Sequence, residues 1–471
     1  MIILGTNSIK DTGYDVANSC RFDRGSSDNL TRTMGTATNV KKFTYSFWIK
    51  RSLLSSGSHT AVDLHADADN RFTIFIHPGD DIRFYNINGG SLVLDKRTNA
   101  KLRDSSAWYH IVCAVDTTQS TAANRAKIYI NGILQDSFGT NTIWDQNYTP
   151  NQGTSSYTHN IGRYGEGGDT FSGYMSEVVM IDGLQLGADS FGEFDSDSGI
   201  WKPIDVSGLT FGNNGVYLDF ENSGALGADV SGNTNNFTVN NLTAIDQSTD
   251  TCTNNFATLN PLSQGVAATS RTFSNGNTSV TFGGADDSSL SSIGVSSGKW
   301  YAEFKITNDS ADPTVGVGNE GSVLVTNPGA CNIGSSTGAY GYYSNGQKRI
   351  NGASKASYGD TFTANDIIGV ALDLDNGAIY FSKNGTFQAS GDPTSGASTT
   401  NAAATSLSGT FFFGCCNSAS GTTGDAFSVN FGSPPYAISS GNTDGNGYGN
   451  FEYAVPSGYY SLNTKNLAEY G

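Results

Sequence analysis

Helical patterns and long hydrophobic runs are both missing from this sequence. No stretch of about a dozen residues repeats apolar side chains at i, i+3 and i+4 without interruption by glycine or β-forming residues. Nothing approaches the ~20 consecutive apolar residues of a membrane-spanning helix. The opening segment MIILGTNSIKDTG (residues 1–13) also lacks a basic start and a long apolar core. The sequence therefore predicts no membrane span and no cleavable signal.

Basic residues are few. Lys and Arg number 26 against 43 Asp and Glu, which gives a formal net charge of −17. Nucleic-acid phosphates are bound by stripes of basic side chains, and no such stripe stands out along the chain. We therefore expect no nucleic-acid partner, no anionic membrane partner, and a well-solvated acidic surface.

Metal-binding and catalytic motifs are missing as well. The five histidines are scattered without an HxH or i, i+4 pair. There is no phosphate-binding P-loop. The cysteines have no CxxC spacing, so buried free thiols are expected rather than disulfides or a zinc site: Cys20, Cys113, Cys252, Cys331, Cys415 and Cys416.

Short strands separated by turns fill the chain instead. Glycine is abundant at 58 residues, and runs with alternating apolar side chains recur, such as FTYSFWIK (43–50), RFTIFI (71–76), WYHIVCAV (108–115) and IIGVALDL (367–374). Asn131-Gly132 and Asn384-Gly385 each follow such a run and are typical of tight hairpin turns. The pattern predicts an all-β protein built from antiparallel sandwiches.

The length of 471 residues exceeds what one hydrophobic core usually supports. We expect two sandwiches, residues 15–230 and 265–436, joined by a polar Asn/Thr/Ser-rich linker over 231–264. Residues 1–14 are the predicted attachment segment. The Gly- and Tyr-rich tail, 437–471, has two interpretations: its aromatic residues dock on the fold, or it is a solvated low-complexity segment.

The second sandwich resembles a SPRY domain. The resemblance is carried by GKWYAEFKI (298–306), by GDTFTANDIIGVALDLDNGAIYFSKNGTFQ (359–388) and by FSVNFGSPPY (427–436). SPRY domains are bent two-sheet sandwiches that bind partners through variable loops, so the resemblance implies binding and no catalysis.

The first sandwich resembles laminin G-like jelly rolls of the concanavalin A type. It contains AWYHIVCAVDTT (107–118) and a family-like F-x-G-x-x-x-E pattern at Phe171, Gly173 and Glu177. This resemblance implies glycan or protein binding, often with calcium. The expected fold class is therefore all-β, with two concanavalin A-like antiparallel β-sandwiches in series and short terminal segments.

The joining regions resemble a third group of proteins. Residues 191–250 and the closing PSGYYSLNTKNLAEYG (456–471) look like segments that tie a laminin G-like domain to a SPRY domain in structural proteins of marine tailed bacteriophages. The resemblance implies a non-enzymatic virion surface protein, a fibre or head-decorating component made in the host cytoplasm. Its expected partners are other virion proteins and a host-surface glycan or protein. It also implies a homo-oligomer, with a trimer as the common form of fibres. A purely architectural capsid or tail protein is the alternative.

Two acidic clusters are candidates for catalysis or for calcium binding. Glu193, Asp195 and Asp197 in GEFDSDSG have the alternate spacing of laminarinase-type glucanases, which share the concanavalin-like fold, but they lack the closing Glu, so a turn is favoured over a catalytic site. Asp63, Asp67 and Asp69 in DLHADADN offer oxygen ligands to calcium. Their spacing is not that of a calcium loop, so a solvated turn is favoured there too, and no cofactor is expected.

Aromatic residues in polar loops are the candidate ligand-binding residues, since sugar faces stack on rings. In the first sandwich the candidate loop is residues 141–160, with the alternative that its rings pin the loop to the core. In the second sandwich it is YGYYSNGQKR (340–349), where alternate tyrosines of the strand must face inward. The candidates are Trp144, Tyr148, Tyr157, Tyr342, Tyr343, Lys348 and Arg349.

Overall fold

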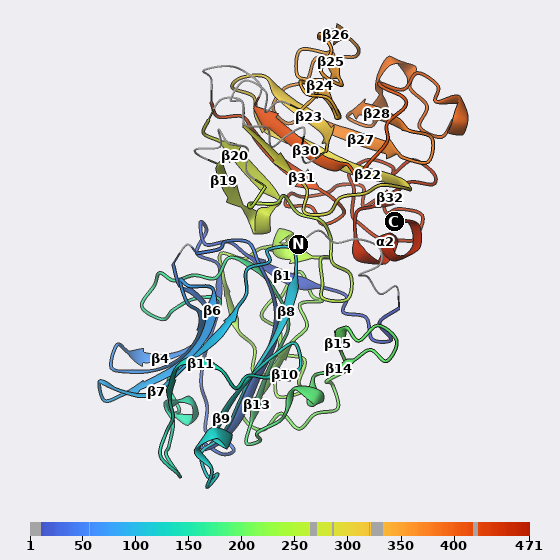
Figure 1. Ribbon diagram of the computed structural model, residues 1–471. Coiled ribbons are helices and arrows are strands. Elements are labelled where there is room, and N and C mark those ends of the chain that lie inside the picture. Colours follow the sequence, from blue (N-terminus) through green and yellow to red (C-terminus); the bar gives the residue numbers. More distant parts are fainter. Residues whose placement is uncertain are drawn as a thin grey trace. The chain divides into compact units, whose positions relative to one another are not determined.

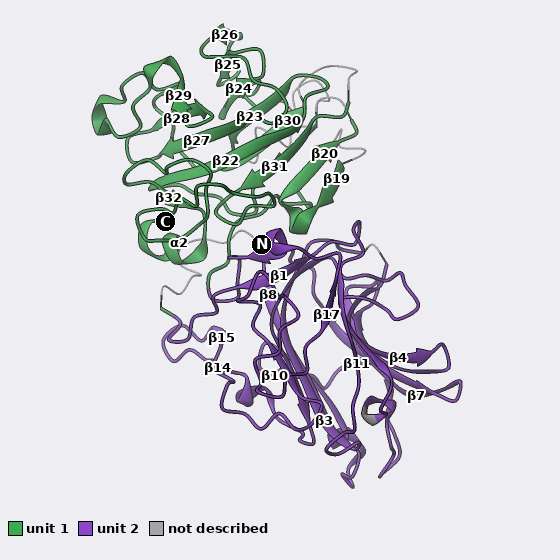
Figure 2. Cartoon of the chain, turned by 180° about the vertical axis from the view of Figure 1, so that it is seen from behind, with its two compact units in different colours: residues 1–11, 254–471 green, residues 12–253 purple. Residues whose placement is uncertain are grey.

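The computed structural model describes residues 11–55, 57–263, 271–284, 287–319, 321, 333–417 and 423–471. Two compact units are present: unit 2, residues 12–253, and unit 1, residues 254–471 together with Asp11 (Figure 2). Both are built from sheets whose strands are antiparallel except for the β22–β32 pair, and a short helix, α2 (Thr464–Tyr470), lies at the end of the chain (Figure 1). The predicted all-β sandwich class is thus confirmed. No helix within the described ranges is long and apolar enough to cross a membrane.

Unit 2 contains two large sheets. The first has the strand order β10-β9-β8-β3-β13-β1-β18, with β16 beside β13, and the second has the order β11-β7-β6-β5-β4-β12-β2-β17. A separate hairpin joins β14 and β15. The strands of the first sheet are Ile133–Leu134 (β10), Ala126–Ile130 (β9), Trp108–Asp116 (β8), Lys42–Arg51 (β3), Gly173–Asp182 (β13), Ser19–Phe22 (β1), Gln247–Ser248 (β18) and Val216–Leu218 (β16). Those of the second sheet and the hairpin are Phe138–Thr142 (β11), Ser91–Lys101 (β7), Asp81–Asn88 (β6), Asn70–Ile76 (β5), His59–Asp67 (β4), Thr158–Ile161 (β12), Asn29–Thr33 (β2), Thr238–Asn240 (β17), Gly192–Phe194 (β14) and Trp201–Pro203 (β15).

Alternation along the strands of the second sheet separates a core face from an outer face. Strand β5 sends Phe72, Ile74 and Ile76 into the core, each at most 1% exposed. The residues between them, such as Arg71 and Thr73, therefore lie on the opposite face. This outer face is the one that carries polar chemistry.

The boundary between the units lies at Thr253, and most of the predicted linker is wrong. Strand β17 pairs with β2, and β18 pairs with β1, so residues up to 253 complete unit 2. Lys50 and Asp250 form a buried ion pair at 2.7 Å inside the unit. The prediction failed because these strands are two or three residues long. Their polar side chains are held by Asx-type bonds, such as those that Asp229 accepts from the Ser231 and Asn235 amides.

Unit 1 also contains two sheets. One has the order β19-β20-β31-β22-β27-β28-β29, with β32 beside β22, and the other has the order β21-β30-β23-β24-β25-β26. The first comprises Arg271–Ser274 (β19), Ser279–Phe282 (β20), Ala426–Asn430 (β31), Lys299–Asn308 (β22), Ile367–Asp373 (β27), Ala378–Lys383 (β28), Thr386–Phe387 (β29) and Tyr460–Ser461 (β32). The second comprises Asp287–Leu290 (β21), Phe412–Asn417 (β30), Pro313–Gly318 (β23), Ala339–Tyr343 (β24), Gln347–Ile350 (β25) and Ala356–Ser357 (β26).

The C-terminal tail is an integral part of unit 1. Strand β32 pairs in parallel with β22, and Phe451 and Tyr459 are at most 1% exposed. Glu303 on β22 accepts hydrogen bonds from the backbone amides of Glu452 at 3.0 Å and Tyr453 at 2.8 Å. Of the two interpretations of the tail, docking on the fold is the one that the structure supports.

Both Asn-Gly pairs form the predicted turns. Asn131 has φ 47° and Gly132 has φ 79°, while Asn384 has φ 48° and Gly385 has φ 82°. These left-handed conformations connect β9 to β10 and β28 to β29. The predicted attachment segment, 1–14, falls mostly on residues 1–10, which lie outside the described residues.

The cysteines within the described residues are free thiols. Cys20, Cys113, Cys415 and Cys416 are buried, and Cys252 is half-buried. Cys331 lies outside the described residues.

Candidate functional site

The candidate loop of unit 2, residues 141–160, turns its largest ring inward. Trp144 is 1% exposed, and its Nε1 donates a hydrogen bond to Asn86 Oδ1 at 3.1 Å. Tyr148 stacks on Trp144 with ring centroids 6.1 Å apart, and its hydroxyl accepts a hydrogen bond from Asn88. Tyr157 is half-buried. Trp144 therefore pins the loop to the core, and its assignment as a ligand-contacting ring is wrong in this structure.

The candidate residues of unit 1 also make contacts within the fold. Tyr342 is fully buried in the core, and Tyr343, 1% exposed, donates a hydrogen bond from its hydroxyl to the Ile333 carbonyl at 3.1 Å. Lys348 and Arg349 are half-buried and donate to the backbone carbonyls of Ala403 and Ala353, respectively. Neither tyrosine presents a ring face to solvent, because both sides of this strand are covered.

Of the acidic cluster, Asp197 lies in the predicted turn, between β14 and β15, whereas Glu193 lies in β14 and Asp195 directly after it. Both carboxylates lie 3.4 Å from Lys202 Nζ in the β14–β15 hairpin. Hydrogen bonds from the Ser198 amide and hydroxyl lower the pKa of Asp195 to about 2. Asp195 therefore holds no proton at neutral pH, and Asp197 is exposed. Nothing in this geometry resembles a pair of carboxylates facing one another across a cleft.

The predicted calcium ligands are separated by the strand. Asp63 is fully buried within β4, where it accepts hydrogen bonds from Thr73 Oγ1 at 2.5 Å and the Gly165 amide at 2.8 Å. Asp67, the last residue of β4, and Asp69, in the turn that follows, are exposed. In the described part of the chain, no three His, Cys, Asp or Glu side chains gather as a metal site would require. The residues in DLHADADN do not fit a bound calcium ion.

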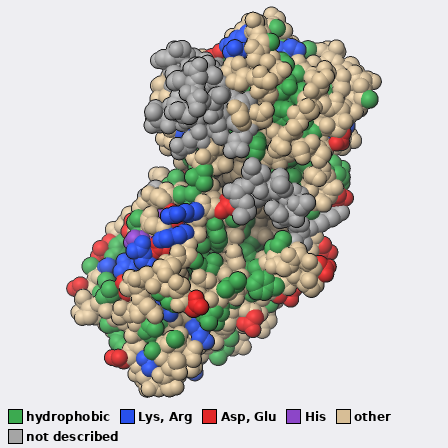
Figure 3. Space-filling model, in the orientation of Figure 1, with side chains coloured by type: hydrophobic (Ala, Val, Ile, Leu, Met, Phe, Trp, Pro, Cys, Tyr) green, Lys and Arg blue, Asp and Glu red, His purple; other side chains and the backbone are tan. Residues whose placement is uncertain are grey.

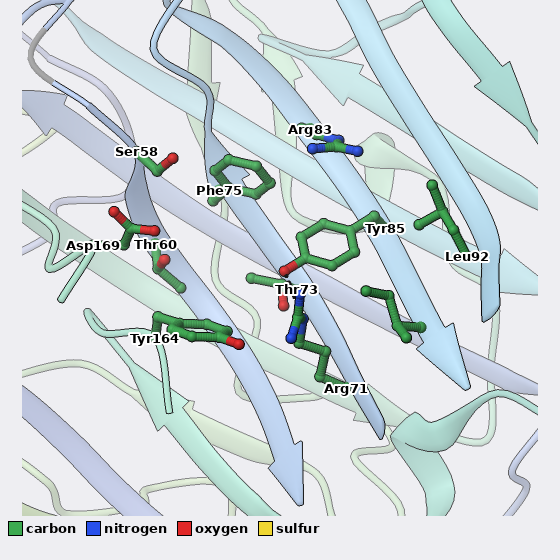
Figure 4. A pocket seen from close by; sticks show the side chains of 11 residues that line it. Ser58, Thr60, Arg71, Thr73, Phe75, Arg83, Tyr85, Leu92, Tyr164 and Asp169 are labelled. Carbon is green, nitrogen blue, oxygen red and sulfur yellow. Dashed lines mark hydrogen bonds between the residues drawn. The ribbon is translucent and has the colours of Figure 1, made fainter. Parts of the chain in front are cut away.

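A pocket of about 320 Å³ lies on the outer face of the second sheet of unit 2 (Figure 4). Strands β4, β5, β6 and β7 form its floor and one wall, and the loop between β12 and β13 forms the other. Tyr164 and Asp169 from this loop face side chains of the strands across the pocket. The lining residues are Ser58, Thr60, Arg71, Thr73, Phe75, Arg83, Tyr85, Ile87, Leu92, Tyr164 and Asp169.

Aromatic rings and guanidinium groups alternate around the pocket. Phe75 and Tyr85 meet edge to face with centroids 5.6 Å apart. The Arg83 guanidinium lies 5.1 Å from the Tyr85 centroid, and that of Arg71 lies 5.3 Å from the centroid of Tyr164. Arg71 Nε also donates a hydrogen bond to the Tyr85 hydroxyl at 3.0 Å. These contacts fix the rings in place before any ligand arrives.

The loop is fastened to the strands beneath the pocket. The Gly165 amide donates to Asp63, and a side chain at residue 165 would place its Cβ 2.4 Å from the His65 ring, so only glycine permits this approach. Burial raises the pKa of Asp63 to about 7, and burial also lowers the pKa of His65. The Tyr164 ring packs edge-on against His65 at 5.3 Å.

Sequence reasoning missed this pocket, although part of its signal was available. Alternation in RFTIFI places Arg71, Thr73 and Phe75 on one face, and IRFYNI places Arg83 and Tyr85 on the same face of the next strand. The two segments pair in register, Phe75 opposite Arg83 and Thr73 opposite Tyr85. The contribution of the loop carries no such signal, because its position depends on the tertiary contact at Gly165.

Two family models match this chain. Residues 24–184, which include the whole pocket, match the concanavalin A-like lectin/glucanases superfamily in its laminin G form. Residues 299–432 match the SPRY domain. The chain carries a laminin G-like domain followed by a SPRY domain. The laminin G-like domain corresponds to unit 2 and the SPRY domain to unit 1.

Three solved structures resemble parts of the chain. The SPRY domain of human HERC1 is 21% identical, with 36% of this chain and 96% of that chain covered and a TM-score of 0.28. A putative carbohydrate binding protein from Bacteroides ovatus is 19% identical, with 48% and 59% covered and a TM-score of 0.32. The heptameric SAP-like pentraxin from Limulus polyphemus is 15% identical, with 37% and 79% covered and a TM-score of 0.28. No curated protein sequence matches the chain.

Proposed function

We propose that this chain is a non-enzymatic binding protein whose laminin G-like domain holds a glycan in the outer-face pocket. The observation that carries the proposal is the pocket itself, in which Phe75, Tyr85 and Tyr164 surround hydroxyl, carboxylate and guanidinium groups. Its volume of about 320 Å³ lies at the lower end of the range of small-molecule sites. Such a space admits one or two sugar rings.

The chemistry of the lining suits a sugar. Sugar rings have one apolar face, which stacks on aromatic rings, and hydroxyl groups around the edge. Tyr164 is half-buried at the wall and offers a ring for stacking. Thr73, 1% exposed, donates its hydroxyl proton to Asp63 and so holds the floor of the pocket in place. The Asp169 carboxylate, also in the lining, is a further hydrogen-bond acceptor.

The same lining supports binding rather than hydrolysis. Glycosidases of this chemistry flank the scissile bond with two carboxyl groups. Among the residues that line the pocket, Asp169 contributes a carboxylate, while Asp63 lies buried beneath Thr73 and Gly165. We therefore propose that a bound glycan is released without being hydrolysed.

The wider setting follows as part of this proposal. The resemblance of residues 191–250 and 456–471 to joining segments of phage structural proteins supports a place on a virion surface. There, many copies of a weak site multiply the attachment to a host envelope. In this arrangement the SPRY domain makes the protein contacts within the particle. The second candidate is a purely architectural virion protein, in which both domains make only protein contacts.

A glycan array probed with the full chain tests the proposal. We expect binding to a subset of glycans, and loss of that binding in Tyr164→Ala. The matched control is Tyr157→Ala, which removes another half-buried tyrosine of the same domain outside the pocket lining. Loss of binding in Tyr157→Ala with none in Tyr164→Ala would move the site to loop 141–160. Release of reducing ends from any bound glycan would contradict the non-enzymatic part.

A further inference from the structure

The outer face around the pocket carries an excess of basic residues. Residues 70–103 contain six Lys and Arg and three Asp, a formal charge of +3 in a chain of −17. The space-filling view shows Lys and Arg side chains gathered, with a histidine among them, over the strands β4 to β6 (Figure 3). The expectation that the chain has no basic stripe is therefore wrong for this segment.

The acids of this segment are buried beneath the bases. Asp95 holds Arg83 through two hydrogen bonds of 2.7 and 2.9 Å, and Asp81 holds both Arg97 and Lys101. The side chains of Asp81 and Asp95 are at most 9% exposed, whereas those of the three basic partners are 28 to 34% exposed. Arg103, 66% exposed, extends the row and lies 3.2 Å from Asp80. On the strand side, the surface that a ligand meets is thus positive, while the loop opposite carries the exposed acids Glu166 and Asp169.

Arg71 is the basic group inside the pocket. It forms no ion pair with a carboxylate of the described residues; its hydrogen bonds go to the Tyr85 hydroxyl and, at 2.5 Å, to the Ala68 carbonyl. Glu166 on the loop lies 3.8 Å from His65 Nε2 instead. The guanidinium therefore still has N–H groups and a positive charge that can bind an anion.

We propose that the pocket takes an anionic sugar, with its carboxylate or sulfate group on Arg71 and its ring against Tyr164. The glycan then continues over Arg83, Arg97 and Lys101. This inference rests on the proposed glycan-binding function and names its ligand class. A guanidinium fork donates two parallel hydrogen bonds to such an oxyanion.

A glycan fits this face better than a nucleic acid does. The net charge of −17 repels a long DNA duplex, most of whose charges lie beyond the patch, whereas a short acidic glycan keeps its charges over the patch, within the Debye length of ~8 Å. The rings in the pocket are few and enclosed, rather than spread along an open groove as in single-strand binders.

Calorimetric titration of the full chain tests the inference with four probes. These are an oligogalacturonate, a sulfated dextran oligosaccharide, a neutral dextran oligosaccharide and a short DNA duplex. We expect one of the two acidic glycans to bind at least about tenfold more tightly than the neutral one, because a charge-assisted hydrogen bond supplies that margin. Which acidic probe binds distinguishes carboxylate from sulfate. Affinity is expected to fall as salt rises.

Variants separate charge from folding. Arg71→Gln is expected to weaken the acidic glycan about tenfold or more, and Arg71→Lys to recover part of the loss, because it keeps the charge without the fork. Lys355→Gln, which removes a half-exposed cation of the SPRY domain, is the control and should change nothing. Unchanged thermal melting confirms that each variant folds.

Three results overturn the inference. Equal affinity for neutral and acidic glycans, with no effect of Arg71→Gln, would contradict the preference for an anionic sugar but would leave the proposed glycan binding intact. Tight DNA binding that Arg71→Gln abolishes shows a general polyanion site. Absence of binding to any glycan, here and on the array, removes the proposed function as well.

Discussion

The buried ion pair between Lys50 and Asp250 makes the most quantitative prediction about the fold. Both side chains are 1% exposed and lie 2.7 Å apart, and Trp108 Nε1 also donates to Asp250 at 3.1 Å. Asp250→Ala leaves the Lys50 ammonium buried without its counter-charge. Removing one partner of such a pair costs ~3–5 kcal/mol. That is a large share of the ~5–15 kcal/mol by which domains are usually stable.

Urea unfolding of the full chain, followed by tryptophan fluorescence, measures the loss. The probe reports mainly on unit 2, which contains four of the five tryptophans: Trp48, Trp108, Trp144 and Trp201. The control is Glu193→Ala, which breaks a partly exposed pair with Lys202 in the same unit and should cost less than ~1 kcal/mol. A double variant, Lys50→Met with Asp250→Leu, should recover much of the stability.

The reasoning is refuted if Asp250→Ala unfolds at the same urea concentration as Glu193→Ala. That result would mean that residue 250 is loosely attached, as a linker residue would be. It would also remove the argument that residues 231–253 complete unit 2.

Three further predictions follow from individual contacts. Burial raises the pKa of Glu177 from 4.5 to about 7, so the contribution of this side chain to stability falls as pH rises through that range. In urea titrations between pH 4.5 and 8, Glu177→Gln should remove up to ~3 kcal/mol of this pH dependence. Identical pH profiles of the variant and the unchanged protein would contradict the prediction. Gly165→Ala should displace the loop from His65 and abolish glycan binding while the melting temperature drops by no more than a few degrees; retained affinity would contradict the pocket geometry. Asp444 accepts five hydrogen bonds within the tail, so Asp444→Ala should expose residues 437–471 to limited proteolysis, whereas an unchanged digest would show that the tail is held elsewhere.

The fold could be predicted from the sequence wherever strands alternate in hydrophobicity. FTYSFWIK became β3 and IIGVALDL became β27, because the alternate apolar side chains of each strand belong to a hydrophobic core; the other face of both strands is buried as well. The polar segment 231–253 could not be predicted, because its strands β17 and β18 pair through backbone groups and polar side chains. Hydrophobicity carries no information on such pairing.

The candidate site shows the same limit at the level of single residues. The polar neighbours of Trp144 predict an exposed ring, yet the ring packs against Phe84 and donates a hydrogen bond to Asn86, both on strand β6. Conversely, Arg71 and Tyr85 lie in segments read as ordinary strands. They form a pocket only together with Tyr164, which tertiary contacts place next to Arg71. Local composition identifies polar loops, but it does not predict whether an aromatic side chain in such a loop points into the core or toward solvent.

Hydrogen exchange measured by mass spectrometry tests the central claim most directly. The full chain is compared with and without the glycan that binds it most tightly on the array. The account predicts new protection in the loop 162–169 and in the strand termini around Arg71 and Arg83, with no change in residues 338–352 of the SPRY domain. Protection confined to residues 338–352, or to loop 141–149 alone, would contradict the placement of the glycan in the pocket of the laminin G-like domain.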